Sequence, residues 1–298
     1  MNWIVLKRSK ILVKGKKSKL NLKGIQEEHK AFLHNLLTND INNLADKKFN
    51  YNFMLDSKGS PLLDFFVYND ENKFIIDTDQ NPNELIEKFN KLKLSLQVFF
   101  EILDYKHLYI FGDDSKKILS NLGLPTPEKF SFEKTDKFYI ANNPLRLGVS
   151  GFDLFGNIDE IVEKLDKNLQ INENDFEDLR IKNCIPKIGK ELKENILPLE
   201  TNIWKYAISL NKGCYVGQEA IARVYYRGKP PRVMAKFSFS KNVKEGEKIT
   251  FDEKPVGTIT SITKDGHEGI GFILRSKVWE GKDYNGIILL KTCEELNV

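Results

Sequence analysis

A pair of apolar runs around a short polar turn constrains the fold of this chain more than any other sequence feature. Residues 51–56 (YNFMLD) and 61–68 (PLLDFFVY) flank the turn SKGS, which predicts an antiparallel β-hairpin. Strand-like alternation also covers residues 18–23, 74–78, 96–103 and 107–112, and helical periodicity covers 25–37 and 83–94. Strands in hairpins that alternate with helices predict an α+β fold, in which helices cover antiparallel sheets.

The pattern changes after Pro230 and Pro231. From about residue 172 up to this point, helical and loop-like segments dominate, whereas short strands punctuated by Gly, Pro and Asp follow it. Short strands at such spacing are typical of a small barrel or sandwich. We therefore expect one region over residues 1–229 and a second, C-terminal β domain over residues 230–298.

Charge and hydropathy exclude several classes of protein. The 298 residues include 46 Lys and Arg against 42 Asp and Glu, a net charge of +4 that is too mild to indicate nucleic-acid binding by the whole chain. Residues 7–23 hold eight bases and no acid, which we interpret as a solvated surface rather than an anionic docking patch. No apolar run approaches 18 residues, so we expect no membrane span.

The cysteines are few and widely spaced. Cys184, Cys214 and Cys293 lie 30 and 79 residues apart, with no CxxC pair. This spacing argues against a disulfide framework and offers no metal or iron–sulfur ligand set, so we expect no bound metal. Because no signal peptide is visible either, the sequence predicts a cytoplasmic protein in a reducing compartment.

One cysteine has a setting that favours reactivity. In NKGCYVGQEAIARVYYRGKPPR (residues 211–232), Cys214 follows Lys212 and Gly213 and precedes a segment with helix-forming character. Helix N–H groups and a cation both stabilise a thiolate. The alternative is that Cys214 is a small buried apolar residue.

The helix that follows carries Glu219, Arg223 and Arg227 at i, i+4 and i+8, so they share one face. They could form an ion-paired ladder or an ordinary solvated helix face, and from the sequence alone we favour the solvated face. Residues 227–232 add a cationic cluster, which suits an anionic group such as a polyglutamate or phosphate and equally suits a charged linker.

Asp64 is the most informative acid in the chain. The period of two in a strand places it on one face with Leu62, Phe66 and Tyr68. Burial among such side chains raises the pKa of a carboxyl group, and the carboxylate could accept two N–H donors from a flat heterocycle. A carboxylate on the solvated face of an edge strand is the alternative.

NKGCYVGQEAIAR closely resembles the K-G-C-Y-x-G-Q-E signature of the YgfZ-type folate-binding proteins, which share a superfamily with the glycine-cleavage T-protein, an aminomethyltransferase. The resemblance extends along most of the chain, although residues 115–140 match poorly. Further matching segments are FLHNLLTNDI (32–41), LDSKGSPLLDFFVY (55–68), RIKNCIPKIGKEL (180–192), LPLETNI (197–203) and VGTITS (256–261).

The resemblance implies a T-protein-like cloverleaf. Two α+β units with antiparallel sheets surround a central channel that holds tetrahydrofolate, and a C-terminal small β-barrel closes it. The implied function is that of a tetrahydrofolate-binding accessory protein in iron–sulfur cluster assembly or repair. Its implied partners are folate and, transiently, iron–sulfur client or assembly proteins, with no nucleic acid or membrane partner, and the chain is expected to be a monomer.

The resemblance also assigns site residues. Cys214 matches the signature cysteine, expected to be the reactive group and to be reachable from the folate channel. Asp64 stands where the T-protein has the second of two adjacent acids beside the folate, and Leu63 stands in place of the first. The remaining residues expected to contact the folate come from the signature and its helix: Lys212, Tyr215, Gln218, Glu219, Arg223 and Arg227.

Two departures from the T-protein pattern weaken the case for aminomethyl transfer. Arg180 is followed two residues later by Lys182 where the T-protein has a glutamate, and Cys184 replaces a turn glycine. Aminomethyl transfer needs acids around the folate nitrogen. Two alternatives stay open: a folate-dependent aminomethyl or one-carbon transferase, and a non-catalytic basic adaptor that binds RNA or a protein.

Overall fold

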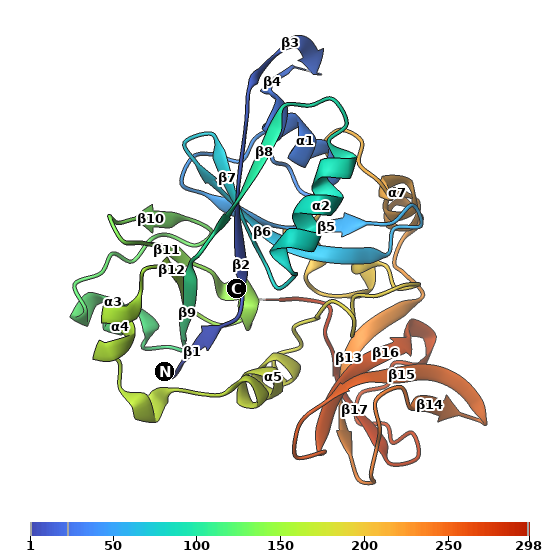
Figure 1. The fold of residues 1–298 in the computed structure, drawn as a ribbon. Coiled ribbons are helices and arrows are strands. Elements are labelled where there is room, and N and C mark those ends of the chain that lie inside the picture. The colour runs from blue at the N-terminus through green and yellow to red at the C-terminus, as the bar shows by residue number, and fades with distance from the viewer. Residues whose placement is uncertain (1, 23, 297) are drawn as a thin grey trace.

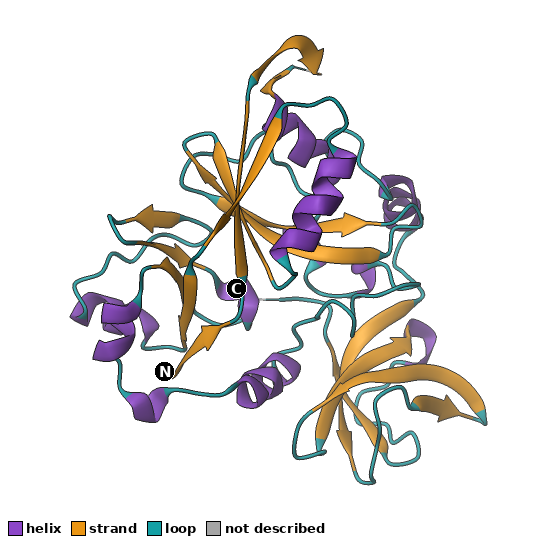
Figure 2. Ribbon diagram, in the orientation of Figure 1, coloured by secondary structure: helices purple, strands orange, loops and turns teal. Residues whose placement is uncertain are grey.

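The computed structural model describes residues 2–22, 24–296 and 298 (Figure 1). Helices pack on the outer faces of antiparallel sheets, as the α+β prediction requires (Figure 2). None of the described helices is both long enough and apolar enough to cross a membrane.

The first sheet has the order β5-β6-β7-β2-β8, and every neighbouring pair is antiparallel. The predicted hairpin around SKGS is confirmed as its β5–β6 pair. Its strands are β2 (Ser9–Gly15), β5 (Phe49–Leu55), β6 (Pro61–Asp70), β7 (Lys73–Thr78) and β8 (Val98–Leu103). Helices α1 (Glu28–Leu36) and α2 (Pro82–Leu92) bury Phe32, Leu33 and Phe89 against one face, as their helical periodicity predicts. Strands β3 (Lys17–Leu22) and β4 (Ile25–Glu27) form a separate two-stranded ribbon before α1.

The second sheet has the order β1-β9-β12-β11-β10 and is also antiparallel. Its strands are β1 (Asn2–Leu6), β9 (Lys106–Phe111), β10 (Phe132–Lys134), β11 (Phe138–Asn142) and β12 (Gly151–Gly156). Helices α3 (Ser115–Asn121) and α4 (Asp159–Lys164) cover its apolar outer face. The chain passes between the two sheets twice, at β1–β2 and at β8–β9.

A shared aromatic core joins the two sheets. Tyr68 of the first sheet packs edge-on to Phe155 of the second, with ring centroids 5.1 Å apart, and Phe155 stacks on Tyr139 at 5.0 Å. These rings are buried, so the facing sides of the two sheets share one core, and each sheet has a separate apolar cluster under its own helices.

The segment after the second sheet leads to the C-terminal β structure. It contains α5 (Glu173–Lys182), α6 (Trp204–Ala207) and α7 (Gln218–Arg227), with short 3₁₀ turns at Lys167–Leu169 and Pro198–Glu200. Two further 3₁₀ turns lie elsewhere: Pro144–Arg146 (η1) between β11 and β12, and Arg275–Lys277 between the last two strands of the C-terminal sheet. The last sheet comprises β13 (Arg232–Phe239), β14 (Lys248–Phe251), β15 (Lys254–Ile262), β16 (Glu268–Leu274) and β17 (Ile287–Thr292). Its order is β14-β15-β16-β13-β17, a curled antiparallel half-barrel with β14 and β17 at the edges of the described sheet. The division of the chain at residues 229 and 230 stays a prediction.

The C-terminal tail corrects the expectation drawn from cysteine spacing. A disulfide joins Cys184, just after α5, to Cys293, just after β17. The sequence argued against a disulfide because the three cysteines are few, widely spaced and without a CxxC pair, but the fold brings both side chains into one buried apolar cluster. Beyond Cys293, Leu296 packs back on the central core, and its carbonyl accepts a hydrogen bond from the Tyr206 hydroxyl at 2.8 Å.

Candidate functional site

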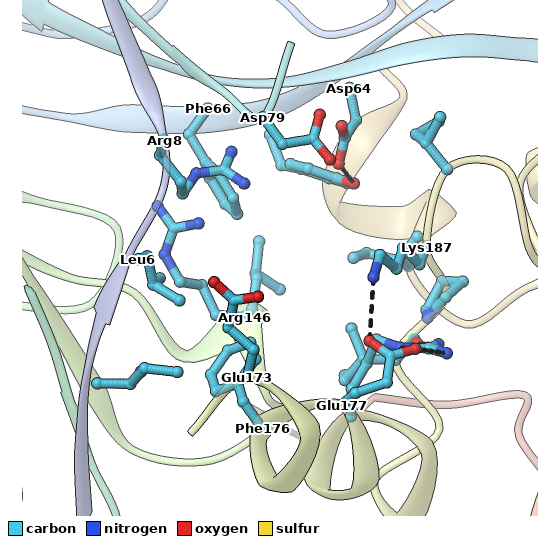
Figure 3. A pocket seen from close by; sticks show the side chains of 18 of the residues that line it. Leu6, Arg8, Asp64, Phe66, Asp79, Arg146, Glu173, Phe176, Glu177 and Lys187 are labelled. Atoms are coloured by element: carbon cyan, nitrogen blue, oxygen red, sulfur yellow. Dashed lines mark hydrogen bonds and ion pairs between the residues drawn. The ribbon is translucent and has the colours of Figure 1, made fainter. Parts of the chain in front are cut away.

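A cavity of about 340 Å³ lies where β1, β5, β6, η1 and α5 meet (Figure 3). This volume falls at the lower end of the range for small-molecule sites. All of its lining residues lie between Ile4 and Ile203, so the C-terminal half-barrel contributes none of them.

Charged side chains of opposite sign face each other across the cavity. Arg8 and Arg146 line one wall, and Asp64 and Asp79 line the next (Figure 3). At the solvent-exposed rim, α5 contributes two glutamates that are paired with lysines: Lys7 with Glu173 at 3.0 Å and Lys187 with Glu177 at 3.1 Å. The cavity can therefore bind a ligand that carries both donors and acceptors.

Asp64 lies where its strand pattern predicts. It shares the cavity with Phe66, and β6 lies inside the sheet between β5 and β7, so the edge-strand alternative is wrong. Burial raises the pKa of Asp64, as expected, although Arg8 and the hydrogen bond from Tyr51 oppose this shift. The Tyr51 hydroxyl donates that bond to Asp64 Oδ2 at 2.5 Å, and burial raises the pKa of Tyr51 well above its usual value, so the phenol keeps its proton. No described residue donates to the other carboxylate oxygen of Asp64, which can accept a hydrogen bond from a ligand.

Arg8 is the residue on the opposite wall with a free donor. Its Nε donates to Asp77 Oδ1 at 2.7 Å, while its buried Nη2 has no hydrogen-bond partner among the described residues. A buried guanidinium N–H without an acceptor costs free energy that a carbonyl or carboxylate of a ligand would recover. Arg8 therefore marks an acceptor position in the cavity.

A buried charge network lies behind this wall. Lys10 donates from Nζ to Asp77 Oδ1 and to His107 Nδ1, both at 2.9 Å, and His107 Nε2 contacts Asp153 Oδ1 at 2.9 Å. Arg146 bridges both carboxylates, Asp77 and Asp153. Burial lowers the pKa of His107 to about 3, so the ring is neutral and Nε2 carries the proton that it donates.

The network holds both carboxylates in their charged form. Burial works against ionisation, but Arg8, Lys10 and Arg146 outweigh it and keep the pKa of Asp77 well below its usual value. Arg146 and His107 do the same for the pKa of Asp153. Three cations face two anions, because burial lowers the pKa of Lys10 only to about 8 and leaves it mostly charged at pH 7. The excess positive charge favours a ligand that offers an acceptor or an anion at the Arg8 wall.

Arg180 connects the cavity to the half-barrel. Its guanidinium donates to Glu177, to Glu191 at 2.9 Å and to the Ser261 hydroxyl at 2.8 Å. Glu191 also accepts from Thr260 and Ser261, both at 2.6 Å. Arg180 is therefore committed to protein partners. The sequence has Lys182 where the T-protein has an acid. Glu177, three residues before Arg180, lines the cavity and supplies a carboxylate there instead.

The lysine and tyrosine of the K-G-C-Y motif hold the loop in place and do not line the cavity. Lys212 is buried and donates to the carbonyls of His34, Leu37 and Asn39 at the end of α1, and burial lowers its pKa to about 8. Tyr215 is buried in the central core. Both were expected to contact the folate, and the structure places both outside the cavity lining.

Gly217 explains the second glycine of the motif. It has φ +84 and caps α7, and a Cβ on it would lie 2.5 Å from the carbonyl oxygen of Asp56. The motif therefore packs the start of α7 directly against the β5–β6 turn.

The structure does not bring Cys214 and Asp64 into one site. Cys214 is a free, exposed cysteine that does not line the cavity. The other residues of the motif helix that were expected to contact the folate do not line the cavity either. Those residues are Gln218, which is half-buried, and Glu219, Arg223 and Arg227, which are exposed. No ion pair joins Glu219 to Arg223 among the described side chains, so this is a solvated helix face, as we favoured, and not an ion-paired ladder.

Most of the site was not predicted from the sequence. The residues that were not predicted are Arg8, Asp79, Arg146, Glu173, Glu177 and Lys187 in the cavity, and Lys10, Asp77, His107 and Asp153 behind it. A signal existed for the second group, because Asp77, His107 and Asp153 interrupt otherwise apolar strand runs. Within the described part of the chain, no group of three or more His, Cys, Asp or Glu side chains is arranged to hold a metal ion.

Among known proteins, aminomethyltransferases resemble this chain both in sequence and in fold. The chain is 46% identical to an uncharacterized protein of Aquifex aeolicus over 140 residues, which are 46% of this chain and 89% of that protein. It is 26% identical to an aminomethyltransferase of Caldanaerobacter subterraneus over 257 residues, 77% of this chain and 67% of that enzyme. The fold matches the crystal structure of glycine cleavage system aminomethyltransferase T from Bartonella henselae with a TM-score of 0.78 and 16% identity, covering 97% of this chain and 84% of the other. No protein-family model matches the chain.

Proposed function

We propose, from the chain's membership of the family of the A. aeolicus protein and of the T-protein (aminomethyltransferase)-like superfamily, that it binds a reduced folate in the cavity. The observation that carries this proposal is that Asp64 and Arg8 both line the cavity, on different walls. A pterin ring has N–H donors on one edge and a carbonyl acceptor beside them. The carboxylate suits the donors, and the unpartnered Nη2 of Arg8 suits the carbonyl.

The rim of the cavity suits the tail of a folate. Lys7 and Lys187 are exposed, and each is paired with one glutamate of α5. Exposed pairs of this kind contribute little stability, so a lysine can exchange its glutamate for a carboxylate of the ligand at small cost. The cavity then holds the ring and the rim holds the glutamate tail.

We further propose that the chain acts as a tetrahydrofolate-dependent accessory factor in iron–sulfur cluster assembly or repair, as a cytoplasmic monomer. The support is the KGCYVGQE motif, which resembles that of YgfZ-type proteins, together with the free and exposed thiol of Cys214. An exposed thiol with helix α7 beginning at Gln218 can react with an oxidant, an iron ion or a sulfur group of a client. Because Cys184 and Cys293 are joined in a disulfide and Cys214 is a single free thiol, the purified chain is expected to hold no stable cluster alone.

The alternative is a folate-dependent aminomethyl or one-carbon transferase. One observation favours it: Asp79 and Glu177 supply carboxylates to the cavity although the sequence lacks acids at positions 63 and 182. Turnover of an aminomethyl donor to methylene-tetrahydrofolate by the purified protein would establish this activity, and loss of that turnover in Glu177→Gln would assign the acid.

Calorimetry with tetrahydrofolate tests the proposed function, followed by the same titration on Cys214→Ala. We expect one site per chain and equal affinity in the variant, because Cys214 lies outside the cavity lining. In cells, Cys214→Ala should abolish support of iron–sulfur enzymes. Absence of folate binding would exclude the proposal as a whole, and full cellular support by Cys214→Ala would exclude the role of the thiol.

A further inference from the structure

Helix α7 presents a stripe of exposed side chains to solvent. Glu219, Arg223, Tyr226 and Arg227 recur at i, i+4, i+7 and i+8, so they share one face of the helix. The opposite face is anchored in the protein interior through Ile221, which is fully buried. Figure 1 shows α7 at the outer side of the molecule, at a distance from α5.

The cations of this stripe lack partners. Arg8, Arg146, Arg180, Arg232 and Arg275 each form an ion pair. Arg223 and Arg227 form none, and neither makes a hydrogen bond with any other part of the chain that the structure describes. Among the described residues, Arg223 and Arg227 are therefore the two arginines without an ion pair, and both lie on α7.

The β5–β6 turn adds a third cation near the start of α7. Gly59 of this turn packs against Gly217 and Ala220, and the neighbouring Lys58 is exposed. The Lys58 ammonium has no ion pair with the described residues. Glu219 is the acid on the stripe, so the surface formed by Lys58, Glu219, Arg223, Tyr226 and Arg227, here called the α7 face, is net positive.

Aromatic and aliphatic side chains stand among these charges. Tyr226 is 76% exposed and Val216, in the loop before the helix, is 51% exposed. Tyr225 supports Tyr226 edge-on, with ring centroids 5.2 Å apart, and is itself held against Trp204. Tyrosine and arginine are the residue types most enriched at the centres of protein–protein interfaces.

We propose that the α7 face docks an acidic segment of a partner protein. A nucleic acid is a poorer fit, because such binding uses many phosphate contacts and this face offers three free cations beside exposed apolar groups. The inference deepens the proposed function and rests on it in one respect: Cys214 lies in the loop directly before α7 and outside the cavity lining, so the group that reacts with it arrives with the docked partner.

The test measures binding of a fluorescently labelled acidic peptide to the full chain by fluorescence anisotropy. The peptide is rich in glutamate and carries one leucine in every helical turn. Two variants with the same change in net charge are compared: Arg223→Glu with Arg227→Glu, and Lys116→Glu with Lys117→Glu on the exposed face of α3. We expect the α7 variant to bind the peptide at least about tenfold more weakly than the wild type and the α3 variant to bind it unchanged. Tyr226→Ala should weaken binding by a smaller factor.

A charge swap adds a positive control. The same peptide with lysine in place of glutamate should bind the Arg223→Glu, Arg227→Glu variant and not the wild type. Equal losses in the α7 and α3 variants, or no binding by the wild type at low salt, would overturn the proposal. Tighter, arginine-dependent binding of a uridine homopolymer than of the peptide would overturn it in favour of RNA.

Tetrahydrofolate titration of the same variants separates the two claims. In the wild type, folate binding with no peptide binding would refute the docking surface alone. Retained peptide binding with no folate binding in the wild type would refute the proposed cavity ligand and leave the docking surface standing.

Discussion

Replacement of Asp64 by Asn tests whether the carboxylate increases the affinity for the ligand while it lowers the stability of the ligand-free protein. The substitution keeps the shape of the side chain and the acceptor for the Tyr51 hydroxyl, and it removes the charge. Because burial raises the pKa of Asp64, the folded chain binds a proton more readily at this position than the unfolded chain does. The protonated carboxyl group therefore stabilises the folded chain at low pH. This contribution to the free energy of unfolding is lost as the pH rises through the raised pKa of Asp64, so the ionised carboxylate destabilises the fold at neutral pH.

Two effects of opposite sign follow for Asp64→Asn. The thermal midpoint at pH 7 should be unchanged or higher, since the buried charge is gone. Affinity for tetrahydrofolate should fall by about 1–3 kcal/mol, the cost of a lost charge-assisted hydrogen bond, which corresponds to about 5- to 150-fold in Kd.

The assay is calorimetric titration with tetrahydrofolate, combined with thermal unfolding of the same samples. Asp70→Asn is the matched control, because Asp70 is on the same strand but contacts Lys134 and Tyr139 outside the cavity. It should leave folate affinity unchanged and lower stability slightly. Undiminished affinity in Asp64→Asn would remove Asp64 from the site, and a large loss of stability would contradict the electrostatic reasoning.

Four further outcomes are expected. Lys212→Ala should destabilise the chain by about 2–3 kcal/mol in urea unfolding, because the substitution leaves buried carbonyls of α1 without a donor, and folate affinity should not change. Stability should fall as pH falls from 6.5 toward 3, because the pKa of His107 is lowered to about 3 and the unfolded chain gains a proton that the folded chain does not; His107→Gln should flatten this part of the curve. Reduction of the Cys184–Cys293 disulfide should lower the free energy of unfolding by about 2–5 kcal/mol, a loss that Cys184→Ser should reproduce without reductant. Iodoacetamide should label Cys214 alone in the unreduced protein, at a rate that folate does not slow, and early labelling of another cysteine would contradict the disulfide.

The sequence predicts several elements of this fold because each of them is encoded locally. The β5–β6 hairpin follows from two alternating runs around SKGS, and the position of Asp64 follows from the period of two along β6. The helical character of residues 218–225 is likewise visible before the structure and appears as α7. In these cases neighbours in sequence determine the outcome.

The parts that could not be predicted depend on contacts between distant segments. Asp77 meets Arg8 and Arg146 from two other elements, and each residue alone is compatible with a solvated position. Lys212 looks like a catalytic neighbour of Cys214, yet its ammonium caps a helix 175 residues away. A single sequence contains no information on such pairings.

A structure of the chain with bound tetrahydrofolate is the most direct test of the central claim. The account predicts the pterin in the cavity, with its N–H edge on Asp64 and its carbonyl within hydrogen-bond distance of Arg8 Nη2. A pterin that lies elsewhere, for example in the hollow beside Trp204 and Tyr225, would contradict the account, as would a folate whose ring makes no contact with either Asp64 or Arg8.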